Sequence, residues 1–232
     1  MTAEEIIKKI KSLGNKRNIE GMARFGIRPK TKVFGVSMPE LRKISKNIIR
    51  QNQDKQKNHN LALKLWDSEI HEARILAGLI ADSEKLTETQ IEKWVSGFDS
   101  WDVVDQVCMN LFDKSVLAKK KISEFATRQP EFEKRTAFAL IAALASHDKK
   151  MSDKDFVNFF TLIKRASIDE RNFVRKAVNW ALRGIGKRNK KLNEEAIKFA
   201  KEIKKIDSKT AKWIAADAIK ELTSEKVLSR LK

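Results

Sequence analysis

The chain has 232 residues, which is enough for one large domain or a short array of repeats with a continuous core. Lysine and arginine number 49 against 31 aspartates and glutamates, which leaves a net charge of +18. Such an excess attracts a polyanion or an anionic membrane surface, and the alternative explanation is a lysine-rich solvated exterior. The longest stretch without an acidic or basic residue, 136–147, is too short to cross a bilayer, which excludes a membrane-spanning protein.

The few cysteines and histidines limit which disulfides and metal sites the chain could form. Cys108 is the single cysteine, so there is no intrachain disulfide, and its apolar neighbours indicate a structural thiol. The N-terminus has no signal-peptide pattern, and we therefore expect a cytoplasmic protein. His59, His71 and His147 are scattered, and HExxH, CxxC and glycine-rich phosphate loops do not occur, so we expect no metal and no cofactor.

Apolar residues recur at helical spacing along the whole chain, and alternating strand patterns are few. The first predicted helix contains Ile6 and Ile10, and the residues from Ser37 to Glu40 have the form of a capping box with an early proline. Five longer helices follow, each after a shorter and more polar one. They are predicted at 70–82, 100–112, 131–146, 171–184 and 208–222.

Several boundaries of these helices can be predicted from single residues. Ser100 occupies the position of an N-cap before the helix that opens at Trp101. Pro130 separates two helices, and we expect Gly184 and Gly186 to close the fourth of the longer helices as C-terminal glycines.

The five longer helices form a loose internal repeat. Its separations of about 30 to 40 residues suit stacked helical pairs, and a coincidence of helical patterning is the alternative. We predict an all-α HEAT-like or armadillo-type helical-repeat solenoid, forming a single domain over residues 1–232. Residues in similar registers should line one concave face that is mainly basic. They are Arg74, Asp105, Arg135, Arg175 and Lys212.

The segment from Ser100 to Asp105 is the most unusual in the chain. Trp101 and Asp105 are four residues apart and therefore share one helix face at the edge of the apolar stripe. A structural interpretation makes Trp101 a residue of the core edge and Asp102 a support for the helix N-terminus. A functional interpretation makes this face part of a site.

Two later segments also allow a functional and a structural interpretation. Arg135 is either one half of a surface ion pair with the nearby glutamate or a phosphate clamp, because guanidinium binds phosphate oxygens as a fork. Lys176 and Trp180 share a helix face. They either pack between repeats or present a cation beside a flat ring suited to sugar or base contact.

Taken in order, several fragments of the chain resemble the AlkD-like family of DNA alkylation-repair glycosylases. The likeness covers nearly the whole chain. The fragments are Met22-Ala23-Arg24-Phe25, Phe34-Gly35-Val36, Pro39-Glu40, Leu65-Trp66-Asp67, Trp101 to Asp105, Arg135-Thr136-Ala137 and Phe173 to Arg183. The family often has tyrosine at the position of Phe25 and a second tryptophan at that of Ser100.

The resemblance implies a HEAT-like solenoid that removes cationic N3- and N7-alkylated purines from duplex DNA without flipping the base. It implies catalytic roles for Asp105, Trp101 and Trp180, and DNA binding by Arg135. An alkylated purine is a good leaving group, and a carboxylate stabilises the oxocarbenium character that develops on the sugar. We expect Asp105 to be that carboxylate and the tryptophan faces to pack against the polarised deoxyribose.

Two other functions remain as alternatives. One is a non-enzymatic repeat protein that binds damaged or branched DNA, and the other is a helical scaffold for acidic protein partners. The four family residues together favour the glycosylase. The partner we expect is duplex DNA with alkylated purines, bound by a monomer, with no membrane. The residues expected to bind this DNA are Arg135, Lys176, Arg175, Arg74 and Lys212.

Overall fold

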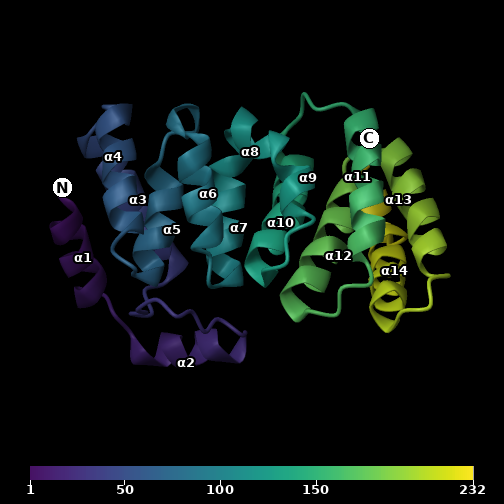
Figure 1. Cartoon of the computed structure of the whole chain (residues 1–232), viewed down its shortest axis with the longest axis horizontal. Helices are drawn as coiled ribbons and strands as arrows, with labels where there is room; N and C mark the ends of the chain where they lie inside the picture. Colours follow the sequence, from purple (N-terminus) through teal and green to yellow (C-terminus); the bar gives the residue numbers. More distant parts are fainter. Residues whose placement is uncertain (232) are drawn as a thin grey trace. The chain divides into compact units, whose positions relative to one another are not determined.

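The computed structural model describes residues 1–231, and within them every regular element is a helix (Figure 1). One isolated bridge between Lys32 and Ile70 is the sole β-type pairing in this range. The all-α prediction is confirmed. In chain order the helices are α1 (Ala3–Ser12), α2 (Lys16–Arg24), α3 (Met38–Gln51), α4 (Lys55–Trp66), α5 (His71–Ile80), η1 (Ser83–Lys85), α6 (Glu88–Ser96), α7 (Trp101–Asn110), η2 (Phe112–Lys114), α8 (Val116–Lys120), α9 (Ile122–Phe125), α10 (Glu131–His147), α11 (Asp153–Ala166), α12 (Asn172–Gly186), α13 (Lys190–Ile203), α14 (Lys209–Leu222) and α15 (Glu225–Leu228).

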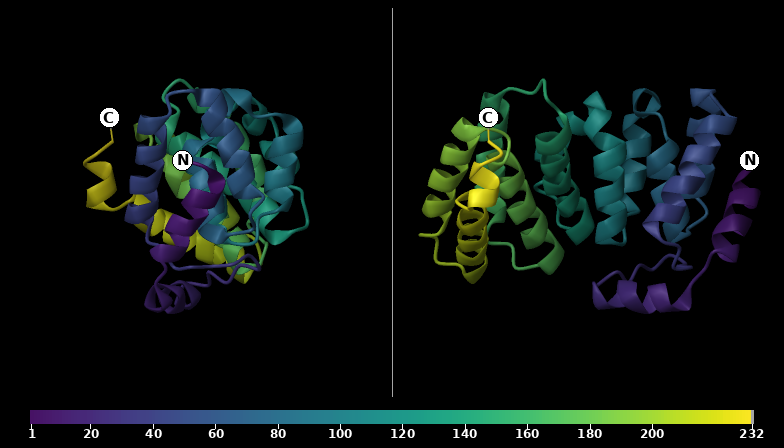
Figure 2. Two further views of the ribbon diagram at one scale, coloured as in Figure 1. Left: turned by 90° about the vertical axis from the view of Figure 1, so that its left-hand side faces the viewer. Right: turned by 180° about the vertical axis from the view of Figure 1, so that it is seen from behind.

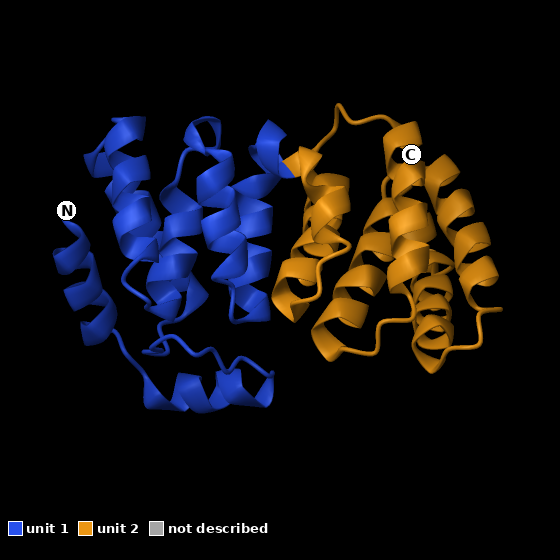
Figure 3. Cartoon of the chain, in the orientation of Figure 1, with its two compact units in different colours: residues 1–118 blue, residues 119–232 orange. Residues whose placement is uncertain are grey.

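The helices divide into two compact units, residues 1–118 (unit 1) and residues 119–232 (unit 2), which are coloured separately in Figure 3. The single domain over residues 1–232 therefore stays a prediction. Within residues 1–231, no helix combines the length and the apolar character needed to cross a membrane.

The core of unit 1 forms around α5, which packs against α3, α4 and α7. Aromatic rings fill the space between α4 and α6. The rings of Trp66 and Trp94 stack with centroids 4.3 Å apart, and Phe98 and Phe112 pack at angles around them. Stacked and edge-to-face pairs of this kind add to the free energy gained by burying their area.

Helix α2 stands apart from this core and runs across one end of helices α3–α7 (Figures 1 and 2). None of its residues is buried, so contacts outside the helix must hold it in place. One contact is the backbone bond from the Asn15 amide to the Phe34 carbonyl, 2.8 Å long. Gly35 has φ +78°, and an added Cβ would lie 2.3 Å from the Asn15 carbonyl oxygen. This approach requires glycine.

Glu72 holds the segment that follows α2. Its side chain is 1% exposed, and its Oε1 accepts hydrogen bonds from three successive amides. These are the amides of Phe34, Gly35 and Val36, at 2.9, 2.6 and 3.3 Å. A carboxylate with several N–H donors is strongly stabilised in its charged form. The position of α2 therefore depends on a residue of α5.

In unit 2, α12 lies at the centre and packs against α10, α11, α13 and α14. We expected Gly184 and Gly186 to close α12, and the helix does end at Gly186, but its C-cap residue is Lys187 and neither glycine occupies the cap position. Their role is close packing. A Cβ on Gly184 would lie 3.4 Å from the Cβ of Ala145, and one on Gly186 would lie 2.6 Å from Leu222 Cδ1.

Two of the predicted helix starts are confirmed in position. Pro130 is the N-cap residue of α10, and Ser37 is the N-cap of α3 with proline in the first turn. The predicted capping box at Ser37 is wrong, because its side chain makes no capping hydrogen bond. Proline at this point removes one of the amide donors that a cap would otherwise satisfy.

Candidate nucleic-acid interface

Trp101 and Asp105 lie on the first two turns of α7, in unit 1, and both are partly exposed. Their spacing places them on one face of the helix, as predicted. The Trp101 indole Nε1–H donates to the carbonyl oxygen of Phe25 at 3.2 Å. Phe25 follows α2 and is 76% exposed. The hydrogen bond therefore joins the start of α7 to the end of α2, and an exposed aromatic ring lies beside it.

A buried polar cluster fixes the start of α7. His71 Nε2 lies 2.9 Å from Asp102 Oδ2, and the Ser100 hydroxyl donates to Asp102 Oδ1. Ser100 is the N-cap residue, but its hydroxyl bonds this carboxylate in place of a helix amide. The order serine–aspartate–histidine leaves the hydroxyl without a base, so the cluster is not a nucleophilic triad. It holds the helix that carries Trp101 and Asp105.

The two charged members of the cluster shift each other's pKa. Burial lowers the pKa of His71, but the hydrogen bond and charge of Asp102, with the charges of Glu72 and Asp99, raise it above its ordinary value. Burial raises the pKa of Asp102, but the hydrogen bond and charge of His71 and the bond from Ser100 lower it below its ordinary value. The protein therefore favours the imidazolium–carboxylate pair.

This pairing predicts how unfolding depends on pH. The contribution of His71 is full below its unfolded pKa of about 6.5 and is lost as the pH rises through the higher folded value. The contribution of Asp102 is present above about pH 3.9 and is lost as the pH falls through its lower folded value. In urea titrations between pH 5.5 and 8.5, we expect the unfolding free energy of the parental protein to fall relative to that of a His71→Gln variant. A constant difference between the two proteins would contradict the pairing.

Arg74, predicted to bind DNA, is 7% exposed and already occupied within unit 1. Its Nη1 donates to the Gly97 carbonyl at 2.7 Å and lies 3.7 Å from Asp99 Oδ1, and its guanidinium lies 5.0 Å from the centre of the Trp66 ring. Asp99 Oδ2 in turn accepts from the Thr31 amide at 2.8 Å. Arg74 ties α5 to the turn before α7, and its burial does not support a place on an open DNA-binding face.

Arg135 is also buried, with 5% of its surface exposed, in the first turns of α10 in unit 2. Its Nη1 donates to the Phe173 carbonyl at 2.5 Å. Arg74 and Arg135 thus occupy equivalent positions in the predicted repeat and make equivalent contacts. Each donates from one helix to a backbone carbonyl near the start of the next helix of the register. A phosphate clamp needs an accessible guanidinium, so the burial of Arg135 does not support that role.

The remaining residues predicted to bind DNA are more accessible and lie in unit 2. Lys176 on α12 and Lys212 on α14 are exposed, and Arg175 is partly exposed. The guanidinium of Arg175 lies 5.2 Å from the ring centre of Trp213, which is 38% exposed. The sequence analysis did not predict this pairing of Arg175 with Trp213. Its sole signal in the sequence is that Trp213 directly follows the register residue Lys212.

Trp180 is partly exposed and lines a pocket of about 370 Å³ in unit 2. Lys149 and Lys187 lie on the same pocket. Lys187 Nζ is paired with Glu221 Oε1 at 2.8 Å, and Lys149 Nζ donates to the Ser146 carbonyl at 2.8 Å. The partly exposed Trp180 therefore lies beside two ammonium groups that already have partners within unit 2, and its ring suits contact with a sugar. Of the predicted site residues, the structure places Trp101 and Asp105 on one helix and Arg175, Lys176 and Trp180 on another. The concave basic face stays a prediction.

Comparison with known proteins agrees with this architecture. No curated protein matches the sequence of the chain. A solved structure of a protein family related to the HEAT-like repeat DNA glycosylases, with affinity for branched DNA structures, is similar with a TM-score of 0.75 and 19% identity over 95% of both chains. A designed armadillo repeat protein in complex with a (KR)4 peptide aligns with a TM-score of 0.38 and 13% identity, over 82% of this chain and 87% of that one.

The first of these likenesses, at low identity, shows the fold: the chain is an all-helical HEAT-like repeat protein. The family model described as DNA alkylation repair enzyme matches residues 6–222. The chain therefore belongs to the family of DNA alkylation repair enzymes.

Proposed function

We propose that this protein is a DNA glycosylase that hydrolyses the N-glycosidic bond of N3- or N7-alkylated purines in duplex DNA. One observation carries the proposal. A chain of the DNA alkylation repair family presents a carboxylate, Asp105, and an indole, Trp101, together on the partly exposed start of α7. The buried cluster of His71, Asp102 and Ser100 holds that start in one position.

The reaction requires mainly electrostatic stabilisation from the protein. Alkylation at N3 or N7 gives the purine a positive charge, so the base leaves without a strong general acid. As the bond breaks, positive charge develops on the sugar, and a fixed carboxylate stabilises it more than water does. Asp105 supplies that carboxylate and orients the water that attacks the sugar carbon. The attacking water gives its proton through Asp105 to solvent, and the bonding electrons leave with the purine, which departs as the neutral alkylated base.

The other residues position the DNA. The indole face of Trp101 packs against the deoxyribose, where the developing charge is attracted to an electron-rich ring. In unit 2, the indole of Trp180 contacts a sugar of the same duplex. Lys176 and Lys212 are exposed and contact phosphates. The ring of Trp213, with the Arg175 guanidinium over it, offers a further aromatic contact for the DNA. Arg74 and Arg135 act indirectly, by holding the helices.

A second candidate is a non-enzymatic protein that binds branched DNA. The structurally similar protein has affinity for branched DNA structures, and this chain exposes two large aromatic residues, Phe25 and Trp213. Exposed rings stack on the unpaired bases that branch points supply. This function needs no carboxylate at position 105.

One assay separates the two candidates. The protein is incubated with a duplex that carries a single N7-methylguanine, and the released base is measured against spontaneous depurination. Binding to a four-way junction of the same length is measured in parallel. The glycosylase proposal requires release above the spontaneous rate. Tight junction binding with release at the spontaneous rate would establish the second candidate in its place.

Binding to unmodified duplex is expected to weaken steeply with salt. Each phosphate contact changes the logarithm of the binding constant by about 0.9 for a tenfold change in salt, because counterions are released. The net charge of +18 and the exposed Lys176 and Lys212 motivate this expectation. Fluorescence anisotropy between 50 and about 200 mM salt measures the slope. An affinity that does not change over this range would contradict phosphate-based binding.

A further inference from the structure

Unit 1 contains a pocket of about 640 Å³ to which the proposed function assigns no role. It lies where the loop before α3, the turn between α4 and α5 and the turn between α6 and α7 meet. Polar and charged side chains make up most of its lining. The charged residues of the lining are Lys11, Lys30, Lys32, Glu69, Arg74 and Asp99.

The charges around this pocket favour an anion. Lys11, Lys30 and Lys32 are exposed at its rim, and Arg74 lies on the buried floor, where its charge is already paired within the protein. Two acids oppose them, Glu69 and Asp99. Asp99 is already compensated, because it accepts from the Thr31 amide at 2.8 Å and lies 3.7 Å from Arg74 Nη1. The rim therefore presents three ammonium groups against one exposed carboxylate.

The backbone fixes the shape of the pocket. Ile70 is the N-cap residue of α5, and Asp99 directly precedes Ser100, the N-cap of α7. Helix α6 ends at the same pocket with Ser96 and Gly97, so the helix dipoles oppose one another and the lysines carry the preference for an anion. Glu69 is held at φ 53°, a strained conformation for a residue with a side chain, by pairing with Lys32. This pairing fixes the Lys32 backbone against the start of α5.

We infer that this pocket binds a phosphate group of the DNA strand that passes Trp101, an inference that rests on the proposed function. Asp99 in the pocket and Trp101 are two residues apart, which spans at most about 7 Å of chain. Phosphates of one strand follow each other every 3.4 Å or so along the duplex axis. A strand whose sugar contacts Trp101 therefore carries phosphates at intervals short enough for one of them to lie at the pocket.

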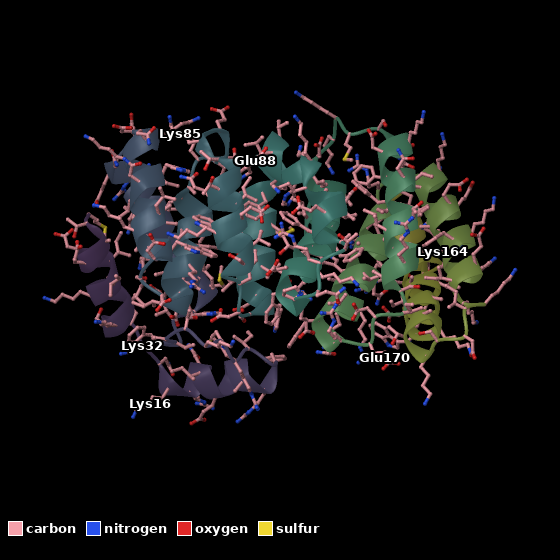
Figure 4. All side chains as sticks on the ribbon, in the orientation of Figure 1. Lys16, Lys32, Lys85, Glu88, Lys164 and Glu170 are labelled. Atoms are coloured by element: carbon pink, nitrogen blue, oxygen red, sulfur yellow. The ribbon has the colours of Figure 1, made fainter. Side chains whose placement is uncertain are left out.

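The test compares two triple variants with the same change of charge. The pocket variant is Lys11→Ala, Lys30→Ala and Lys32→Ala. The control variant is Lys43→Ala, Lys46→Ala and Lys85→Ala, which replaces exposed lysines outside the pocket. Figure 4 shows Lys32 near α2 and Lys85 at the opposite end of the helices of unit 1. All six positions are exposed, so both variants should fold.

Duplex affinity is measured for both variants and the parental protein over a range of salt. Loss of one phosphate contact should weaken binding about tenfold near 0.1 M salt and reduce the salt slope by about 0.9. We expect this loss in the pocket variant beyond any loss in the control. Equal losses in the two variants would overturn the inference.

A second arm uses inorganic phosphate to distinguish the two sources of the anion. Amide signals of Thr31 and Lys32 are followed by NMR during titration with phosphate. Saturable shifts that the pocket variant lacks, together with the DNA defect, support a site for strand phosphate. The same shifts without a DNA defect would overturn the DNA assignment in favour of free phosphate. If the parental protein shows the DNA dependence but releases no base, the proposed catalysis fails and the pocket inference stands.

Discussion

Replacing Glu72 with alanine is expected to lower the free energy of unfolding by at least about 3 kcal/mol, because three amide donors lose their acceptor. The amides of Phe34, Gly35 and Val36 all donate to Glu72 Oε1. An unsatisfied buried donor costs about 1–3 kcal/mol, so the sum is a large part of the stability of an ordinary domain. The change should also release the segment that holds α2.

Glu72→Gln is the matched control for this prediction. It keeps an oxygen acceptor for the three amides and places an amide group where Oε2 lies buried without a hydrogen bond. We expect a loss smaller than that of the alanine variant. Urea unfolding gives the free energies, and hydrogen exchange over residues 15–37 reports the release of α2. If the alanine variant retains both parental stability and parental exchange in this segment, the role assigned to Glu72 is wrong.

The positions of the long helices could be predicted because the local signals agree. The predicted range 171–184 compares with α12 at Asn172–Gly186, and the predicted range 208–222 compares with α14 at Lys209–Leu222. Apolar periodicity sets the length of such helices, and caps and prolines set their starts. The glycines Gly184 and Gly186, near the end of α12, were a less reliable signal. They permit close helix packing, and the sequence does not distinguish this role from helix termination.

The direction of side chains in the repeat could not be predicted. Arg74 and Arg135 occur in the predicted register, yet both turn into the protein and donate to carbonyls of Gly97 and Phe173. Register fixes the place of a residue along a helix, and the neighbouring repeat determines whether its charge faces solvent. Lys212, on the last of the long helices, is exposed as expected.

The contact between His71 and Asp102 at the start of α7 could in principle have been predicted from the spacing of the repeat. His71 and Asp102 are 31 residues apart, which is the separation of the register residues Arg74 and Asp105. Polar residues at equivalent helix starts in adjacent repeats are expected to lie side by side. The contact from Glu72 to the segment after α2 has no such periodic signal, because that segment lies outside the repeat.

Replacing Asp105 with asparagine is expected to slow excision of N7-methylguanine by about 100-fold, since a fixed charge that stabilises the transition state is lost. That corresponds to about 2.7 kcal/mol of barrier. The substitution keeps the size of the side chain and removes a negative charge that faces DNA. Duplex affinity should therefore stay the same or rise slightly. Asp67→Asn is the control, because Asp67 is an exposed carboxylate of the same unit.

A purely structural role for Asp105 predicts a different pattern. The asparagine variant would then lose thermal stability and keep its rate per folded molecule. Melting temperature, duplex affinity and excision rate are therefore measured on the same preparations of the parental, Asp105→Asn and Asp67→Asn proteins. A parental melting temperature in the Asp105→Asn variant ensures that a slower rate is not a loss of folded protein.

The proposed glycosylase activity depends on Asp105. Its decisive test is single-turnover release of N7-methylguanine from a duplex, with protein in excess over DNA. We expect release well above spontaneous depurination for the parental and Asp67→Asn proteins, and about 100-fold slower release for Asp105→Asn. Release by Asp105→Asn at the parental rate would show that Asp105 is not the catalytic carboxylate.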